Sequence, residues 1–401
     1  MNRKKILFFA EAVTLAHVGR ALTLAATLDP ARYDIHFACA PGYDFCFTGT
    51  AFTRWTVNSI PSSQFLQALA DGKPVYSNVT LGSYVEEDLR LLDQLRPDVV
   101  IGDFRISLSI SARLAGIPYI ALSNAYWSPF LRQRYTVPNI PLTKMLPVAL
   151  ADLLFRMARP IAFASHAVPL NRVRRKHGLP SLGSDLRRVY TDADYTLYAD
   201  VPELFPGHQD LPRNHRFLGP VMWAPPVALP PWWSELPAKL PVIYVTLGSS
   251  GQGKLLPLVL RALADLPVTV IAATAGNIAI DQVPDNAWVA DFLPGDQAAA
   301  RAALVICNGG SPTSHQALAA GVPVLGISSN LDQFLNMHGI VSAGAGAQLR
   351  ADRFDAIRLQ AMVADLLDNP AAAQAARSLA ATFAGHDHAA RFHAVLTEIL
   401  A

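Results

Sequence analysis

The chain has 401 residues, a length that predicts two domains and excludes a small disulfide-stapled module. Hydrophobic residues make up 51% of the chain and charged residues only 16%, which excludes intrinsic disorder and requires a large apolar interior. Lysine and arginine number 33 and aspartate and glutamate 31, so the formal net charge of +2 argues against a nucleic-acid partner.

Short apolar runs alternate with helical patterns through the first half of the chain, as in βαβ units with parallel strands. The first run ends at Glu11, which makes it too short for the core of a signal peptide and favours a strand. A helix is expected over residues 19–28. The predicted strands of this half are residues 5–10, 34–38, 98–101 and 119–122.

The same alternation returns in the second half, after a proline-rich span that can continue neither a helix nor a central strand. The predicted strands here are residues 242–247, 268–272, 287–290, 304–307 and 324–327. We therefore predict an N-terminal domain over residues 1–219, a linker over 220–240 and a C-terminal domain over 241–401. The last helix of the chain can cross back to the N-terminal domain.

The predicted fold class is α/β, with two Rossmann-like, doubly wound parallel sheets whose strand carboxyl ends face a shared cleft. The apolar stretch 145–170 is interrupted by Asp152, Arg156 and Arg159, so we do not expect it to span a membrane. The three cysteines form no Cys-x-x-Cys pair, which gives no support to structural zinc or to a disulfide framework. The expected location is therefore the reducing cytoplasm.

A glycine-rich turn separates the predicted strand 304–307 from a helical pattern between His315 and Ala320. It reads Asn308, Gly309, Gly310, Ser311, Pro312, Thr313, Ser314. Glycines let the backbone approach a ligand closely, and the unpaired amides and dipole at a helix start favour an anion. The turn therefore predicts a phosphate site, with an ordinary N-cap and tight turn as the alternative.

Four further motifs flank this turn in a fixed order. They are residues 246–250 (Thr-Leu-Gly-Ser-Ser), residues 284–286 with 292–294 (Pro-Asp-Asn and Phe-Leu-Pro), residues 317–323, and Asp332 with Gln333. Together with the turn, they resemble the family-1 glycosyltransferases of bacterial type, which are UDP-sugar-dependent enzymes with the GT-B fold. The resemblance extends over essentially the whole chain. It implies an N-terminal acceptor-binding domain and a C-terminal domain that binds a nucleotide-sugar donor.

The resemblance also implies which residues bind the donor. In the family's pattern, Phe292 and the backbone of Leu293 hold uracil, a glycine and hydroxyl set holds the diphosphate, and an Asp-Gln pair binds the sugar. An N-cap is the alternative role for Asp332. The complete predicted donor set is Gly248, Ser249, Phe292, Leu293, Asn308, Gly309, Gly310, Thr313, Gln316, Asp332 and Gln333.

Two of these residues depart from the family's pattern. Asn308 stands where the family has a phosphate-binding histidine, and Gln316 stands where it has a ribose-binding glutamate. An asparagine amide still donates to phosphate, and a glutamine carbonyl still accepts from ribose. The nucleotide is therefore expected to be UDP, with dTDP as the alternative.

The first domain offers a candidate catalytic pair. His17 lies near the start of the helix that follows the first strand, where a helix N-terminus keeps an imidazole neutral and able to accept a proton. Asp103 follows the strand 98–101 and so lies on the same edge of the sheet. The resemblance implies that the histidine deprotonates the acceptor hydroxyl and that the aspartate orients it, as in hydrolase triads. Packing or capping roles are the alternatives for both residues.

An inverting displacement follows, in which the diphosphate leaves toward the glycine turn and neither a cofactor nor a metal is expected. Asp192 and Asp194 read as an Asp-x-Asp metal motif, but that motif belongs to a different fold. The expected partners are a nucleotide sugar and a small, rather apolar hydroxyl acceptor, as in natural product glycosylation. The basic run 172–176 allows weak peripheral contact with a membrane, although a solvated helix face explains it as well.

Two other functions remain open at this point. A nucleotide-sugar epimerase shares the two-domain architecture, but such an enzyme brings carboxylates to its cleft, and the motifs contain no such cluster. The departures at Asn308 and Gln316 suggest instead a non-catalytic homologue that binds a nucleotide.

Overall fold

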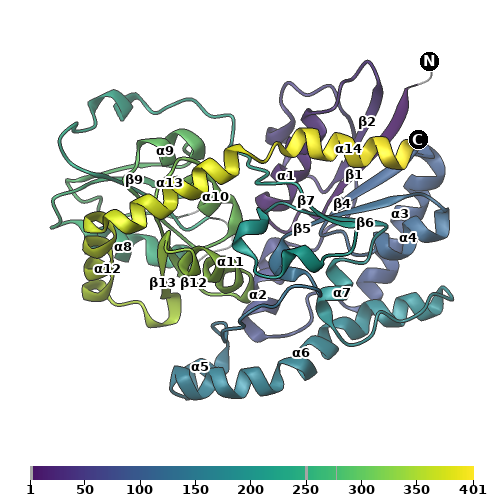
Figure 1. Cartoon of the computed structure of the whole chain (residues 1–401), viewed down its shortest axis with the longest axis horizontal. Coiled ribbons are helices and arrows are strands. Elements are labelled where there is room, and N and C mark those ends of the chain that lie inside the picture. Colours follow the sequence, from purple (N-terminus) through teal and green to yellow (C-terminus); the bar gives the residue numbers. More distant parts are fainter. Residues whose placement is uncertain (1–2, 249–251, 277) are drawn as a thin grey trace. The chain divides into compact units, whose positions relative to one another are not determined.

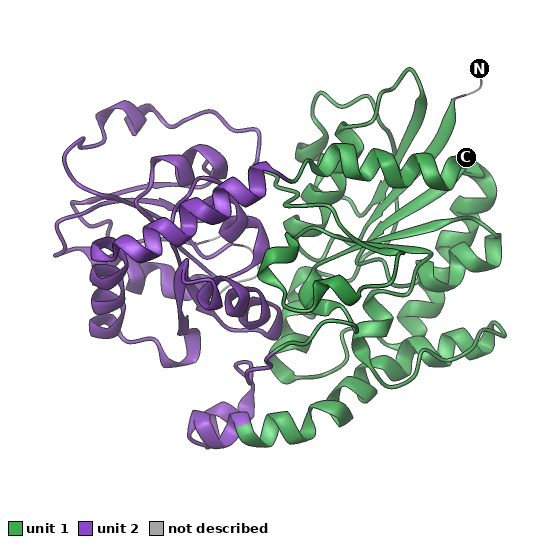
Figure 2. Ribbon diagram, viewed as in Figure 1, with its two compact units in different colours: residues 1–133, 153–223, 386–401 green, residues 134–152, 224–385 purple. Residues whose placement is uncertain are grey.

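The computed structural model describes residues 3–248, 252–276 and 278–401. Contacts divide the chain into two units, coloured separately in Figure 2. Unit 1 contains residues 1–133, 153–223 and 386–401, and unit 2 contains residues 134–152 and 224–385. The predicted domain ranges are contiguous, whereas these units exchange two segments. The C-terminal segment belongs to unit 1 because its helix packs on the first sheet.

Unit 1 is built on a seven-stranded parallel sheet with the strand order β3-β2-β1-β4-β5-β6-β7 (Figure 1). Its strands are β1 (Lys4–Ala10), β2 (Tyr33–Cys39), β3 (Thr53–Thr56), β4 (Val99–Asp103), β5 (Tyr119–Ser123), β6 (Tyr195–Tyr198) and β7 (His215–Phe217). The chain moves outward from β1 to β3, then returns to β4 beside β1 and moves the other way. The topological switch point therefore lies between β1 and β4, where ligands bind in open sheets of this kind.

Helices cover both faces of this sheet. Side chains of β1 alternate between the two faces: Ile6 and Phe8 pack with α1 and α14, whereas Leu7 and Phe9 pack with α3 and α4. The α-helices of the unit are α1 (Leu15–Ala26), α2 (Ser62–Asp71), α3 (Asn78–Leu95), α4 (Leu108–Ala115), α7 (Leu186–Tyr190) and α14 (His388–Leu400). The long helix α6 (Val148–Lys176) starts in unit 2 and continues in unit 1.

Unit 2 repeats the architecture with a six-stranded parallel sheet of order β10-β9-β8-β11-β12-β13. Its strands are β8 (Val242–Thr246), β9 (Thr269–Ala273), β10 (Ala287–Ala290), β11 (Leu304–Cys307), β12 (Val324–Ser328) and β13 (Gly346–Arg350). Its α-helices are α5 (Pro141–Met145), α8 (Leu256–Leu263), α9 (Gly295–Arg301), α10 (Ser311–Ala319), α11 (Leu331–Ser342), α12 (Ala356–Asp368) and α13 (Pro370–Ala384). The switch point of this sheet lies between β8 and β11.

All nine predicted strands are present, each within two residues of its predicted ends. These nine do not include β3, β6, β7 and β13. Of these four, β3, β7 and β13 lie at the edges of the two sheets, and β6 lies next to β7. Helix α1 begins at Leu15, four residues before the predicted start. This shift makes His17 the third residue of the helix.

Candidate functional site

The two residues of the predicted catalytic pair meet at the switch point of unit 1. Asp103 is the last residue of β4 and His17 lies in the first turn of α1, directly after β1. The Nδ1 atom of His17 lies 2.7 Å from Oδ1 of Asp103. The aspartate side chain is fully buried, whereas that of His17 is 19% exposed. The imidazole is therefore anchored from inside and remains reachable from outside.

Arg20, one helical turn after His17, binds the same carboxylate in a bidentate manner. Its Nε donates to Oδ2 of Asp103 at 2.6 Å and its Nη2 donates to Oδ1 at 2.8 Å. Burial opposes ionisation of Asp103, but the charge and hydrogen bonds of Arg20, aided by His17, hold the pKa of its carboxyl below the usual value. Asp103 is thus an ionised carboxylate that bonds two donors at once.

A third hydrogen bond of Arg20 extends this network across the sheet. Its Nη1 donates to Oδ1 of Asn124 at 2.8 Å, and Nδ2 of Asn124 donates in turn to the carboxylate of Asp200. Burial alone would lower the pKa of Arg20, but Asp103 more than offsets it and the pKa lies above its usual value. Arg20 is therefore a permanent cation that fixes the Asp103 carboxylate.

Phe104, the residue after Asp103, covers the face of the His17 ring. The two rings are stacked at 4.9 Å between centroids, with an interplanar angle of 8°. Phe104 has a φ of +58°, a left-handed conformation that is uncommon for a bulky residue. Its ring also contacts Tyr190 at 5.2 Å and Phe65 at 6.0 Å. Consecutive residues thus hold the imidazole at its edge and at its face.

A second charged cluster lies beneath this turn. Arg105 is fully buried and pairs with Glu11 at the end of β1 and with Asp88 in α3, at 3.1 and 2.9 Å. Burial raises the pKa of both carboxyls, against the opposing effect of Arg105. Because this cluster joins the ends of β1 and β4 to α3, it supports the strand ends next to His17 and Asp103.

In unit 2, the predicted glycine turn leads straight into α10, which begins at Ser311 with Gly310 as its N-cap. Oδ1 of Asn308 accepts a hydrogen bond from the amide of Gly310 at 2.9 Å. Gly309 has a φ of +83°, and a Cβ there would lie 2.7 Å from side-chain atoms of Met337 and Ser328. Only glycine fits at this position, so the turn keeps its backbone close to α11 and β12.

Other members of the predicted donor set lie along the same edge of the sheet. Gly248 follows β8, and a Cβ on it would lie 3.2 Å from Nδ2 of Asn308, so the two loops at the switch point are adjacent. Ser249 lies outside the described residues. Thr313 is half-buried in the first turn of α10. The Phe292 side chain is 37% exposed, whereas Leu293 is buried.

Of the residues predicted to bind the ribose and the sugar, Gln316 and Gln333 are buried and Asp332 is half-buried. Gln316 is buried in α10, and its amide oxygen lies so close to Gly295 that a Cβ there would collide with it. Asp332 lies in the first turn of α11, where Asn330, rather than Asp332, is the N-cap. Oε1 of Gln333 accepts from the amide of Ser329 at 2.8 Å and from the amide of the N-cap Asn330 at 3.3 Å, and the second bond completes the capping box of this helix. A sugar contact through this oxygen would require the cap to open.

The structure therefore groups the predicted residues into two sets. His17 and Asp103 lie at the switch point of unit 1, and the described donor residues lie at the carboxyl edge of unit 2. The sequence prediction missed Arg20 and Phe104 as parts of the site. Arg20 has a recognisable signal, because it is the only charged residue in α1 and lies one turn from His17. The left-handed conformation of Phe104 has no recognisable signal in the sequence.

The Asp-x-Asp motif has structural partners. Asp192 pairs with Arg113 and with Arg174, the latter at 2.7 Å, and Asp194 accepts from the amide of Tyr119 at 2.8 Å. Within the described residues, no group of three or more His, Cys, Asp or Glu side chains is arranged to hold a metal ion. The described helices likewise include none that is long and apolar enough to cross a membrane.

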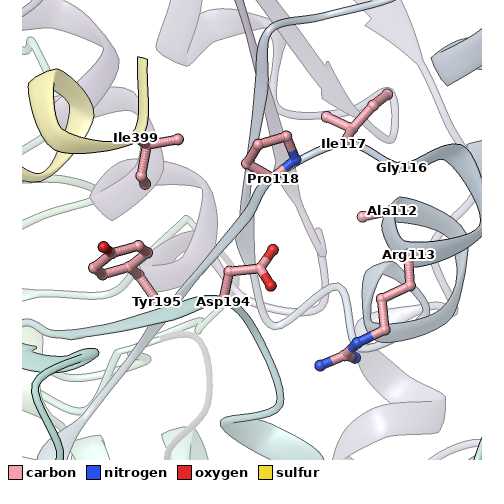
Figure 3. Close-up of a pocket in the computed structure, with 8 residues that line it drawn as sticks. All are labelled: Ala112, Arg113, Gly116, Ile117, Pro118, Asp194, Tyr195 and Ile399. Carbon is pink, nitrogen blue, oxygen red and sulfur yellow. The ribbon is translucent and has the colours of Figure 1, made fainter. Parts of the chain in front are cut away.

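A cavity of about 470 Å³ lies elsewhere in unit 1 and is shown in Figure 3. Asp194 and Tyr195 line it from the start of β6, and Pro118 lines it from the residue before β5. Because parallel strands start at one edge of a sheet and end at the other, this cavity lies at the edge opposite Asp103. It is separate from His17 and Asp103.

Comparisons with known proteins place the chain in a family. A family profile, the C-terminal domain of erythromycin biosynthesis protein CIII-like proteins, matches residues 257–396. The PGL/p-HBAD biosynthesis glycosyltransferase of Mycobacterium tuberculosis (strain ATCC 25177 / H37Ra) is 54% identical over 382 residues, covering 95% of the chain and 89% of the relative. The PGL/p-HBAD biosynthesis rhamnosyltransferase of Mycobacterium bovis (strain BCG / Pasteur 1173P2) is also 54% identical over 382 residues, with coverages of 95% and 85%.

Solved structures support the same grouping at the level of the fold. Spinosyn rhamnosyltransferase SpnG in complex with thymidine diphosphate is similar with a TM-score of 0.68 and 19% identity, covering 98% of the chain and 100% of that structure. The predicted fold class, with two Rossmann-like parallel-sheet units as in GT-B enzymes, is confirmed. Together with the 54% identity, these findings show that the chain belongs to the family of the PGL/p-HBAD biosynthesis glycosyltransferases and is a glycosyltransferase.

Proposed function

We propose that this glycosyltransferase is an inverting enzyme that moves a sugar from a nucleoside diphosphate to a hydroxyl of a small, apolar acceptor. The observation that carries the proposal is the 2.7 Å contact between His17 and the buried, ionised Asp103. A carboxylate at Nδ1 makes that nitrogen the protonated one and leaves Nε2 to accept a proton. This arrangement suits a general base.

The reaction then balances as a single displacement. His17 takes the proton from the acceptor hydroxyl while the acceptor oxygen forms a bond to the anomeric carbon. The bond between that carbon and the diphosphate oxygen breaks, and the electron pair leaves with the nucleoside diphosphate. Asp103 stabilises the imidazolium through Nδ1, and the anionic product is favoured by the amides around Gly310 at the start of α10.

The donor is proposed to be a rhamnosyl nucleoside diphosphate with a pyrimidine base. Support for the sugar comes from a relative with 54% identity that is described as a rhamnosyltransferase. Support for a pyrimidine comes from the structure of SpnG with thymidine diphosphate and from Phe292, whose half-exposed ring lies at the carboxyl edge of the sheet. Uridine and thymidine differ at the ribose 2′ position, where Gln316 is proposed to read the sugar.

The test combines turnover, binding and stereochemistry. The His17→Ala variant is expected to lose about 10² to 10⁴ in turnover of the best UDP- or dTDP-linked rhamnose donor while nucleotide binding by calorimetry stays unchanged. His177→Ala, outside the proposed site, is the matched control and is expected to behave as wild type. Product analysis by NMR is expected to show the opposite anomeric configuration to the donor. Wild-type turnover by His17→Ala would refute the base assignment, and retention would refute the displacement.

A further inference from the structure

Helix α6 exposes a set of large apolar side chains that the glycosyltransferase chemistry does not explain. In the part of the helix that belongs to unit 1, Met157 is 72% exposed and Ile161 is 75% exposed. Other apolar side chains on this part of the helix also face solvent, namely Leu153, Leu154 and Val168. A soluble surface rarely exposes so many large apolar side chains within sixteen residues.

These side chains form one continuous stripe. At about 100° per residue, Leu153, Met157, Ile161 and Val168 fall within a sector of about 80°. A neighbouring side of the helix packs inward, since Phe163, Ala167 and Leu170, at about 260° to 320° on the same scale, are buried. The stripe therefore follows a solvent-facing side of α6, which contains Pro160 and Pro169 and which Figure 1 shows as a bent helix. We refer to the residues 153–168 on this side as the apolar stripe.

The charges next to the apolar stripe are of one sign. Arg172, Arg175 and Lys176 are exposed and continue the stripe into the last turns of the helix, and exposed Arg156 flanks it. Arg174 is different, because it is buried and bonds the carbonyl of Ser109 and the carboxylate of Asp192. The acidic residues of the whole helix amount to Asp152, which lies before the stripe and accepts from the amide of Val137.

This pattern selects among possible partners. Two copies of the chain packing antiparallel through α6 would set the basic end of each helix against the apolar stripe of the other. Parallel packing would set the two basic ends against each other. Neither arrangement is self-complementary. An anionic bilayer interface matches both halves of the helix, because its headgroups attract Arg and Lys while its acyl boundary accepts Leu, Met and Ile.

We propose that the outer side of α6 docks the protein on an anionic membrane, with the helix lying in the plane of the interface. The contact is peripheral: apolar side chains of the stripe enter the headgroup and acyl boundary, and the basic end binds lipid phosphates. This inference is independent of the donor and of the catalytic pair, since α6 contains none of the residues assigned to them.

Sedimentation with vesicles tests the proposal. The full chain is expected to bind vesicles of phosphatidylcholine with about 30% phosphatidylglycerol, and to bind pure phosphatidylcholine at least about tenfold more weakly. The double variant Met157→Ser/Ile161→Ser and the triple variant Arg172→Gln/Arg175→Gln/Lys176→Gln are each expected to weaken binding by about tenfold or more. Only the charge variant should lose the dependence of binding on salt.

Two matched controls guard against a general effect of surface change. Val79 and Ile357 are 76% and 77% exposed on other helices, and Val79→Ser/Ile357→Ser is expected to bind vesicles as wild type does. All variants are expected to keep wild-type donor hydrolysis in the absence of vesicles, which shows that they fold. The proposal is overturned if wild type fails to bind the anionic vesicles, or if the α6 variants bind as well as wild type. Concentration-dependent self-association that is lost in Met157→Ser/Ile161→Ser would overturn it in favour of a contact between copies.

Discussion

The most demanding prediction separates the two tasks of Asp103, which binds both the proposed base and a buried cation. Asp103→Asn keeps the size of the side chain and removes its charge. The change should therefore affect stability through Arg20 and turnover through His17. The double variant Arg20→Met/Asp103→Asn removes the cation together with the carboxylate and so isolates the second effect.

The expected magnitudes follow from the contacts. Arg20 makes two charge-assisted hydrogen bonds to Asp103, at 2.6 and 2.8 Å, and its side chain is only 11% exposed. Removing the partner of a buried ion costs about 3 to 5 kcal/mol, because the remaining charge is uncompensated. Replacing both residues by neutral groups should restore most of this free energy of unfolding. Turnover should fall by about 10² to 10⁴ in both variants, since neither retains the carboxylate behind His17.

The assay measures urea unfolding by tryptophan fluorescence and release of nucleoside diphosphate under saturating donor and acceptor. We expect Asp103→Asn to lose both stability and turnover, and Arg20→Met/Asp103→Asn to regain stability alone. If the double variant regains turnover together with stability, Asp103 is only a structural partner of Arg20. The proposed role of this carboxylate in catalysis would then be refuted.

Three further predictions concern the turn, the acid stability and the nucleotide. Gly309→Ala should lower the free energy of unfolding in urea by about 2 kcal/mol or more, because the added Cβ collides with neighbouring side chains. Gly207→Ala is the control: its φ is also left-handed but the space around it is open, so the change should cost only about 1 kcal/mol. The pKa of Asp103 is lowered on folding, so its contribution to stability is present above about pH 4 and is lost as pH falls below that value. Arg20→Met/Asp103→Asn should therefore lose less stability than wild type on acidification. Equal losses would contradict the assignment. Gln316→Glu should raise the affinity for UDP relative to dTDP by about 10-fold or more in calorimetry, because a carboxylate accepts strongly from the 2′-hydroxyl that dTDP lacks. An unchanged ratio of affinities would place the ribose elsewhere.

The sequence was sufficient to locate most of the central strands of both sheets, because short apolar runs bounded by Gly, Pro or Asp are typical of buried parallel strands. It was less informative at the edges. Strands β3 and β7 have only four and three residues, and β13 begins with Gly346 and Ala347, so none has a clear apolar pattern. The return of the last helix to the first domain was allowed for, whereas the assignment of residues 134–152 to unit 2 depends on contacts far along the chain, which no local pattern reports.

Side-chain positions were predictable where the residues follow adjacent strands of a parallel sheet. His17 and Asp103 follow adjacent strands, and the parallel sheet brings such residues together. Gln333 shows the opposite case, since a glutamine three residues after Asn330 fits both a sugar site and a capping box, and the structure has the capping box. Family membership decides for a glycosyltransferase over the epimerase alternative, which the motifs alone left open.

The polar groups at the two switch points differ in a way that fits different substrates in the two units. In unit 1, Arg20 and Arg105 are each paired with buried carboxylates, so neither cation is available to a diphosphate. In unit 2, the loop at the switch point holds Gly309 and Gly310 and continues into the start of α10, where backbone amides favour an anion. An acceptor hydroxyl needs a base and no positive charge, whereas a diphosphate needs donors and no carboxylate. The two strand-end sites therefore fit the proposed function, in which unit 1 binds the acceptor and unit 2 binds the donor.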